Sequence, residues 1–488
     1  MMRKSDQQLC SDQEGKPFYC GSKTSTRRVR EFFLLGAFLS LCAVAITPLF
    51  FGNEWTKENG YIVLLVYSLI GTATLAKYRN LTVFVVPTSL IFLYVSWSMT
   101  IGAWGHSISA VLSQQQYENF LALQKIDEAL VIFMLTLAVL IPLSRLFSRP
   151  NNLAYKAIKF PPKPLFISIL LLASFLFITI DLSPLGGSGT LNNIPKALLS
   201  ISVIILFANM RGTPRYFFYI LLIALNASVA SFNKREAIFL IFVVLFLEAY
   251  NGRLRGNSSL LIKAFLTLIA IVALVLGMSI YRGYGDYEVD NFISAFRYIV
   301  PYVSSEFFLA WFLNNIEANY FFFHAVNSIE MILLNPENIT FGSTLIKFLF
   351  LPFPRELFPW KPDSAIHLYT MAYDPQYRAL GGSWPINIVS ELIWNFWLLA
   401  PIGAALLTWL FSRLETAIVT TRLKQHSLTM VFYLFVYMNS ITLARGSGLD
   451  QYLFELIIAY VFVLFIRITV SLLGLPSATG SQLKFFRK

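Results

Sequence analysis

The chain has 488 residues and a net charge of +12, with 56% hydrophobic and only 13% charged residues. Soluble domains usually carry about 25% charged residues, so too few polar side chains are present to cover a soluble globule of this length. The composition therefore excludes a cytosolic enzyme, a disordered chain and a secreted disulfide scaffold. Apolar runs of about 20 residues recur along the chain, which is the length that a helix needs to cross a bilayer.

These runs predict an all-α, polytopic integral membrane protein with about twelve transmembrane helices. Residues 1–31 form a polar N-terminal tail, 32–280 hold the first nine helices, 386–474 the last three, and 475–488 a second tail. The apolar windows are 32–51, 60–76, 81–103, 128–144, 164–182, 196–210, 216–232, 237–250, 264–280, 386–411, 428–444 and 452–474.

The distribution of Lys and Arg predicts the orientation. Basic residues concentrate before the first span, between residues 145 and 163, and in the other segments that fall inside when both termini are cytoplasmic. The positive charge thus orients the protein against membrane lipids, and nucleic-acid binding is not indicated. The three cysteines show no C-x-x-C or zinc spacing, so we expect neither a metal site nor a cofactor.

One long segment, 281–385, falls on the outer face in the C-terminal half of the chain. Long loops in compact proteins are usually functional. Its aromatic and apolar stretches 298–313, 320–334 and 341–353 are expected to lie at the membrane interface or to re-enter the membrane. Two full crossings within this segment would raise the number of spans to fourteen without moving either terminus.

Candidate binding residues occur at the outer ends of the predicted spans, where charge is costly and often functional. Lys234 and Arg235 lie in the very short connection between the seventh and eighth spans, and Arg282 directly follows the ninth. We expect these cations either to hold an anionic substrate group or to reach toward lipid phosphates.

A proline-rich segment carries the second group of candidates. Four prolines between residues 351 and 362 fix φ and exclude a regular helix. The stiff segment presents Arg355 and Lys361, which suit phosphate groups, and Trp360, which suits stacking on a sugar. The alternative is an ordinary rigid loop.

The last hairpin and the tenth span supply the remaining candidates. Arg445 and Asp450 flank a glycine-rich turn; the glycines suit close approach of a ligand, whereas an ion pair between the two residues would simply close the hairpin. Ser383 is expected to cap a helix that Pro385 begins, which puts Glu391 just inside the membrane face.

A carboxylate in that position suits a general base. Glu391 is therefore the first candidate for the base, with pairing to Asn395 or an arginine as the alternative. His367, just past the proline-rich segment, is the second candidate.

Four local motifs in residues 220–475 resemble the O-antigen or oligosaccharide repeat-unit polymerase family of the Wzy type. The segment Ser231–Ala237 is similar to the family's Gly/Ser-x-Arg turn, and Pro352–Pro362 to its aromatic, proline-rich stretch. Glu391 begins a Glu-x-x-x-Asn-Phe pattern in which Trp397 stands where the family usually has Gly. Leu443–Asp450 is similar to enterobacterial common antigen polymerases.

The resemblance implies a metal-independent glycosyltransferase without cofactors. Such enzymes join glycan repeat units on undecaprenyl diphosphate at the periplasmic face of the bacterial inner membrane, and a chain-length regulator is an expected partner. The catalytic residues would then be Glu391, His367 and Arg445. The substrate-binding residues would be Lys234, Arg235, Arg282, Arg355, Trp360, Lys361 and Asp450.

Three other functions remain open on the sequence alone. An O-antigen ligase would share the topology and the arginines. A transporter or flippase for a lipid-linked sugar would place ionisable residues near the bilayer midplane. A sensor or scaffold would tolerate replacement of Arg355, Glu391 and Arg445.

Overall fold

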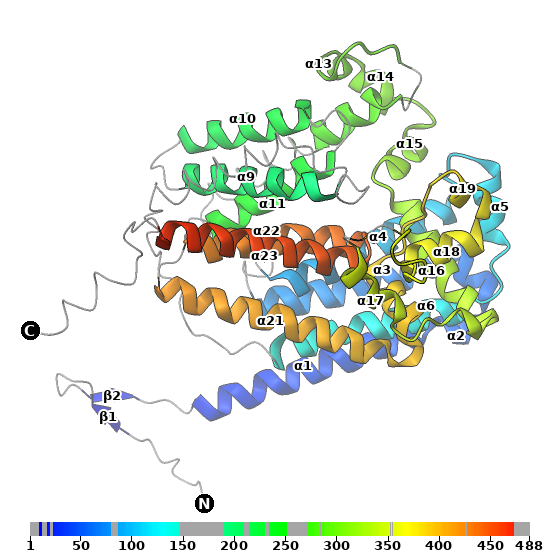
Figure 1. Cartoon of the computed structure of the whole chain (residues 1–488). Helices are drawn as coiled ribbons and strands as arrows, with labels where there is room; N and C mark the ends of the chain where they lie inside the picture. The colour runs from blue at the N-terminus through cyan, green and yellow to red at the C-terminus, as the bar shows by residue number, and fades with distance from the viewer. Residues whose placement is uncertain are drawn as a thin grey trace, which may run out of the picture.

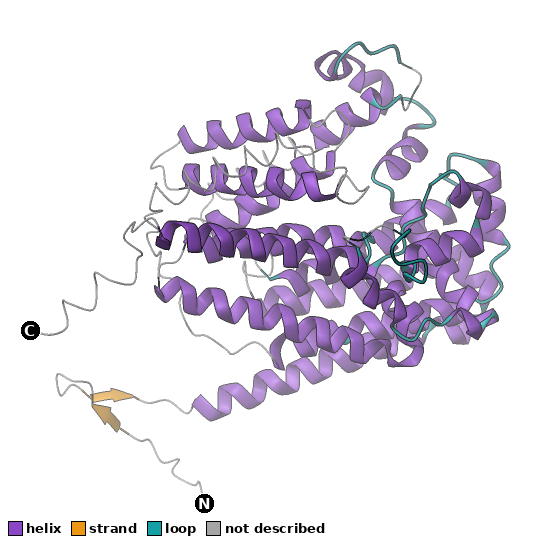
Figure 2. Ribbon diagram, viewed as in Figure 1, coloured by secondary structure: helices purple, strands orange, loops and turns teal. Residues whose placement is uncertain are grey.

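The computed structural model describes most of the chain. The described residues are 9–11, 17–19, 23–79, 86–146, 190–208, 214–229, 234–250, 269, 272–283, 285, 287–351, 353, 355–424 and 427–472. The predicted span 164–182 lies outside them. Apart from a short antiparallel hairpin of β1 (Leu9–Ser11) and β2 (Pro17–Tyr19) in the N-terminal tail, the described elements are helices (Figure 2).

The long helices lie side by side in one bundle (Figure 1). Five helices among the described residues are long and apolar enough to cross a membrane: Glu31–Phe51, Asn53–Lys77, Ile126–Leu143, Ile388–Leu414 and Leu449–Thr469. The prediction of an all-α membrane protein is confirmed at this level. The bundle elements are α1 (Lys23–Ile46), α2 (Pro48–Phe51), α3 (Asn53–Arg79), α4 (Pro87–Ser107), α6 (Ile126–Ala138), α7 (Leu140–Leu146), α9 (Thr190–Ala208), α10 (Pro214–Val229), α11 (Lys234–Tyr250), α20 (Ile388–Phe396), α21 (Ala400–Lys424), α22 (Ser427–Arg445) and α23 (Leu449–Leu472).

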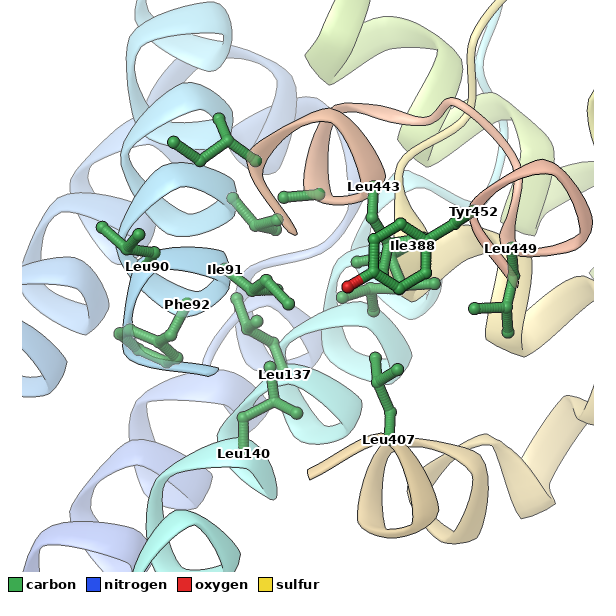
Figure 3. Close-up of a cluster of buried hydrophobic side chains, with 14 of the residues drawn as sticks. Leu90, Ile91, Phe92, Leu137, Leu140, Ile388, Leu407, Leu443, Leu449 and Tyr452 are labelled. Carbon is green, nitrogen blue, oxygen red and sulfur yellow. The ribbon is translucent and has the colours of Figure 1, made fainter. Parts of the chain in front are cut away.

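One hydrophobic core joins the early and late helices. Figure 3 shows Ile91 of α4 and Leu137 of α6 in the same buried cluster as Ile388 of α20, Leu443 of α22 and Tyr452 of α23. Large apolar side chains also remain exposed on the outside of the long helices, as expected where lipid replaces water. The core therefore packs the early helices α4 and α6 against the late helices α20, α22 and α23.

The predicted outer segment contains a helix that belongs to this core. Residues 320–334 were expected to lie at the interface or to re-enter the membrane, and they form a helix, α16 (Ala318–Leu334). Most of its residues are buried, including Phe322, Val326 and Ile329. Two glycines of α4 permit this packing, because a Cβ at Gly102 would lie 2.2 Å from the carbonyl oxygen of Ala318.

Gly102→Ala tests this close crossing. The added methyl group would force α4 and α16 apart, and overpacking of this kind costs about 1–3 kcal/mol of stability. We expect a lower thermal unfolding midpoint for the purified protein in detergent. Gly36→Ala in α1 is the matched control, since nothing lies within 4 Å of a Cβ there; equal midpoints for the two variants would contradict the crossing.

The other short helices of the 281–385 segment gather at one end of the bundle (Figure 1). That end is opposite to the one at which α1 begins and α23 ends. A second, smaller hydrophobic cluster forms around Ile280 and Tyr302. The elements are α5 (Gln114–Leu121), which precedes the segment, and α13 (Phe292–Ala295), η3 (Phe296–Tyr298), α14 (Ile299–Val303), α15 (Phe308–Asn315), η4 (Pro336–Asn338), α17 (Ser343–Phe350), α18 (Ala365–Tyr373) and α19 (Pro375–Ala379).

The predicted window 386–411 matches the apolar stretch Ile388–Leu414, but the helix within it is interrupted. Helix α20 ends at Phe396, a 3-10 turn covers Trp397–Leu399, and α21 follows. The expected start is also wrong: Asn387, not Ser383, is the cap, and its side chain accepts hydrogen bonds from the backbone of Val389 and Ser390. Hydropathy alone could not reveal the break, because both helices are apolar.

The break depends on an unusual backbone conformation at Trp397. Its φ is 51° and its ψ is −126°, a region that favours glycine because a Cβ is crowded there. We expect Trp397→Gly to be more stable than Trp397→Ala by about 1–2 kcal/mol. Both variants lose the indole, so the difference in their unfolding midpoints measures the backbone cost; identical midpoints would contradict it.

Candidate functional site

The candidate site lies where α17, α20 and α23 meet. Glu391 is in the first turn of α20, with an exposed fraction of 1%. The backbone N–H of Leu449 lies 2.9 Å from each of its carboxylate oxygens. Because Leu449 begins α23, Glu391 places hydrogen-bond acceptors at the N-terminus of that helix, where backbone N–H groups have no partner within the helix.

A buried ion pair lies beside this cap. Lys347 Nζ of α17 is 3.4 Å from Asp450 Oδ2 of α23, and their side chains are 9% and 4% exposed. Asp450, which the sequence analysis names as a substrate-binding residue, pairs with Lys347. The sequence analysis did not single out Lys347. A single lysine within the apolar stretch 341–353 could have indicated a buried ion pair, because a charge in such a stretch needs a partner.

Asn395 ties α17 to α20. Its side-chain oxygen accepts hydrogen bonds from Thr344 Oγ1 at 2.6 Å and from Thr340 Oγ1 at 2.9 Å, and its nitrogen donates to the carbonyl oxygen of Glu391 at 3.0 Å. The sequence analysis gave pairing of Glu391 with Asn395 as an alternative. In the structure, the Asn395 side chain binds the backbone carbonyl of Glu391 and not its carboxylate. Asn395 fixes the position of α17 against the turn that carries Glu391.

The proline-rich segment lies against this site. Its described residues contain no regular helix, as four prolines predict. The guanidinium of Arg355 contacts the carboxylate of Asp363, and Lys361 Nζ donates to the carbonyl oxygen of Phe353 at 3.0 Å. Burial, then the charges of Lys347 and Arg355, lower the pKa of Lys361. The three cations are therefore electrostatic neighbours.

His367 adds an imidazole to the same region. It lies in the first turn of α18, and its Nδ1 is 3.7 Å from Asp363 Oδ1 and 3.2 Å from Arg378 Nη2. The contact with His367, together with the charge of Arg355, lowers the pKa of Asp363. Asp363 thus stays anionic and links Arg355 to His367. Neither Asp363 nor Arg378 was singled out from the sequence.

Arg445 has a partner that the sequence did not indicate. Its guanidinium contacts the carboxylate of Glu317, with Nε–Oε2 at 2.7 Å. Glu317 has a φ of 63° in the joint between α15 and α16. The alternative of an Arg445–Asp450 pair closing the hairpin is wrong, because the two residues bind Glu317 and Lys347 respectively.

The glycines of this turn serve the fold. Gly446 has a φ of 112°, and a Cβ there would lie 2.1 Å from the carbonyl oxygen of Ile386. The sequence analysis expects the glycines to permit close approach of a ligand. In the structure, the group close to Gly446 is the backbone of Ile386, the residue before the cap of α20. This contact holds the α22–α23 turn against the start of α20.

Of the remaining candidates, Trp360 lies on the surface of the proline-rich segment, and the others lie on other elements. Trp360 is 64% exposed and meets the edge of Phe350, with ring centroids 4.7 Å apart. Arg282 follows the helix Val272–Tyr281, which packs into the smaller cluster. Lys234 and Arg235 begin α11, but their side chains lie outside the described part of the structure.

The site therefore combines exposed and buried charge. At the surface, Arg355 and Lys361 can bind phosphate oxygens and His367 can exchange a proton. Beneath them, Glu391 and the Lys347–Asp450 pair hold α17, α20 and α23 together.

No family model, curated protein or solved structure matches this chain.

Proposed function

We propose that the chain is a repeat-unit polymerase of the Wzy type. It is a glycosyltransferase that joins oligosaccharide units carried on undecaprenyl diphosphate at the periplasmic face of a bacterial inner membrane. In this proposal the chain has twelve spans, or fourteen if two segments of 281–385 cross fully, and both termini are cytoplasmic. Its substrates are lipid-linked glycans, and a chain-length regulator is the expected partner.

One observation carries the proposal: three cations, Lys347, Arg355 and Lys361, occur in and beside the proline-rich segment. Lys347 pairs with the distant Asp450, and Arg355 with the nearby Asp363. The side chain of Arg355 is half exposed, and Lys361 Nζ lies near the carbonyl oxygens of Leu351 and Phe353 in the same segment. A diphosphate is a dense anion and is also the leaving group in this reaction. Several cations at one place stabilise its departure.

The arrangement of the bundle agrees with the proposed orientation. Helices α17, α18 and α19 lie at the end opposite to the start of α1 and the end of α23 (Figure 1). If both termini are cytoplasmic, the end with α17–α19 is periplasmic. That is the side on which lipid-linked repeat units are joined in the family that the sequence resembles.

The backbone at Trp397 supports the resemblance. The family pattern usually has Gly directly after Glu-x-x-x-Asn-Phe, and this chain has Trp. Its φ of 51° is nevertheless a conformation that favours glycine. The backbone after Phe396 therefore has a conformation typical of glycine, although residue 397 is Trp.

The chemistry follows from the exposed groups. The bond between the donor's anomeric carbon and its diphosphate oxygen breaks, and that carbon bonds to a hydroxyl oxygen of the acceptor unit. Arg355 and Lys361 stabilise the departing diphosphate, and His367 takes the proton of the hydroxyl. His367 is 32% exposed, whereas Glu391 is buried against Leu449. We therefore assign proton transfer to His367 and a positioning role to Glu391.

A gene deletion separates the polymerase from the ligase alternative. Cells without the polymerase would attach a single repeat unit to the lipid A core, whereas cells without a ligase would attach none. We expect single units, and restoration of long chains by the wild-type gene. Complete absence of attached units would overturn the proposal in favour of a ligase.

A flippase would give a third result. Its loss would deplete repeat units from the periplasmic face, and the purified protein would leave glycan length unchanged. Helices α17 and α18, which carry Lys347 and His367, lie at one end of the bundle (Figure 1), which favours the polymerase over a transporter.

A further inference from the structure

Helix α17 has its polar side inward and its apolar side outward. Thr344 and Lys347 are buried and bind Asn395 and Asp450. Ile346 and Leu349, on the other side, are 50% and 55% exposed. A surface helix in water has the reverse pattern. The outward side of α17 therefore suits contact with hydrocarbon, while its inward side shields the buried charges.

The proline-rich segment extends this apolar surface. Phe353, Leu357 and Trp360 are 44%, 66% and 64% exposed. They lie within a few residues of Arg355, whose side chain is 51% exposed, and of Lys361. We define the α17 face as Ile346, Leu349, Phe353, Leu357 and Trp360. The same stretch of chain thus presents exposed apolar side chains and the half-exposed guanidinium of Arg355.

We propose that the α17 face binds the prenyl chain of a polyprenyl diphosphate while Arg355 binds its diphosphate. The inference rests on the proposed function and adds where the lipid carrier docks. An amphiphile with a long hydrocarbon chain and a compact, highly charged head fits both parts of the surface. A free phosphate would leave the apolar part unused, and an uncharged lipid would offer Arg355 and Lys361 no phosphate oxygens beside the Asp363 carboxylate that Arg355 already contacts.

Photocrosslinking tests the proposal in the full-length protein. A benzophenone side chain replaces Leu349 or Leu357, and the purified variants are placed in phosphatidylcholine nanodiscs. Labelled undecaprenyl diphosphate or labelled phosphatidylglycerol is added at equal mole fraction before illumination. Ile402 of α21, an exposed apolar residue on a long helix, carries the benzophenone in the matched control.

We expect several-fold more crosslinking of undecaprenyl diphosphate than of phosphatidylglycerol at Leu349 and Leu357, and equal crosslinking of both at Ile402. Arg355→Ala should remove the preference but leave the total lipid crosslinking at Leu349 unchanged. Equal labelling by both lipids at Leu349 would show ordinary bilayer contact and overturn the inference. Absence of lipid crosslinking at both positions would place the face outside the membrane and also overturn it.

Failure of this inference is distinguishable from failure of the proposed function. If the purified protein lengthens glycans but the α17 face crosslinks both lipids equally, only the docking site is contradicted. A clear preference without lengthening would instead retain a polyprenyl diphosphate site in a protein that is not a polymerase.

Discussion

Glu391→Ala is expected to destabilise the protein by about 2–4 kcal/mol, because it removes a helix cap and leaves a buried N–H without an acceptor. The lost acceptor serves Leu449 at the start of α23. Thermal unfolding of the purified protein in detergent measures the effect. Glu455→Ala on the same helix is the control, since that carboxylate accepts a hydrogen bond from Gln451 and should cost only about 0.5–1.5 kcal/mol.

Glu391→Gln separates positioning from proton transfer. The amide oxygen can still accept from Leu449, so we expect a loss of about 1 kcal/mol and a transfer rate per folded molecule close to that of the wild type. His367→Gln should abolish most transfer without this loss of stability. A folded Glu391→Gln protein with no transfer activity would return the role of general base to Glu391.

Arg355→Ala is expected to reduce the transfer rate about a hundredfold to a thousandfold, the usual effect of removing one group that stabilises developing negative charge. Its side chain is half exposed, so the unfolding midpoint should change little. Arg355→Lys keeps the charge but loses the two-pronged geometry of the guanidinium, and an intermediate rate is expected. The rate is measured with lipid-linked repeat units and purified protein.

Arg297→Ala is the matched control for Arg355. Arg297 is an exposed arginine of η3 in the same outer segment, and it lies in the part that packs around the smaller cluster. We expect its transfer rate to equal that of the wild type. Equal rates for Arg355→Ala and Arg297→Ala would remove Arg355 from the site.

Hydropathy predicted the helices of the bundle because burial in lipid requires continuous apolar runs. The same principle could not show that α16 packs into the core or that the run at 386–411 breaks at Trp397. Both outcomes depend on local contacts, such as the close crossing at Gly102. The proline-rich segment was predicted correctly because φ at proline is fixed by covalent geometry.

The partners of the charged residues could not be predicted. Arg445 binds Glu317, which is 128 positions away, and Glu391 caps a helix that begins 58 positions later. Nothing in the local sequence encodes such pairs. The sequence singles out charged residues, but only packing decides which of them are buried supports, such as Asp450, and which remain exposed, such as Arg355.

The most direct test of the account is glycan synthesis by the purified full-length protein. The wild type and Arg355→Ala are incubated with undecaprenyl-diphosphate-linked repeat units in detergent, and product lengths are separated by electrophoresis. The account predicts a ladder of lengthened lipid-linked glycans for the wild type and only single units for Arg355→Ala over the same time. Single units alone with folded wild-type protein, or an undiminished ladder with Arg355→Ala, would contradict it.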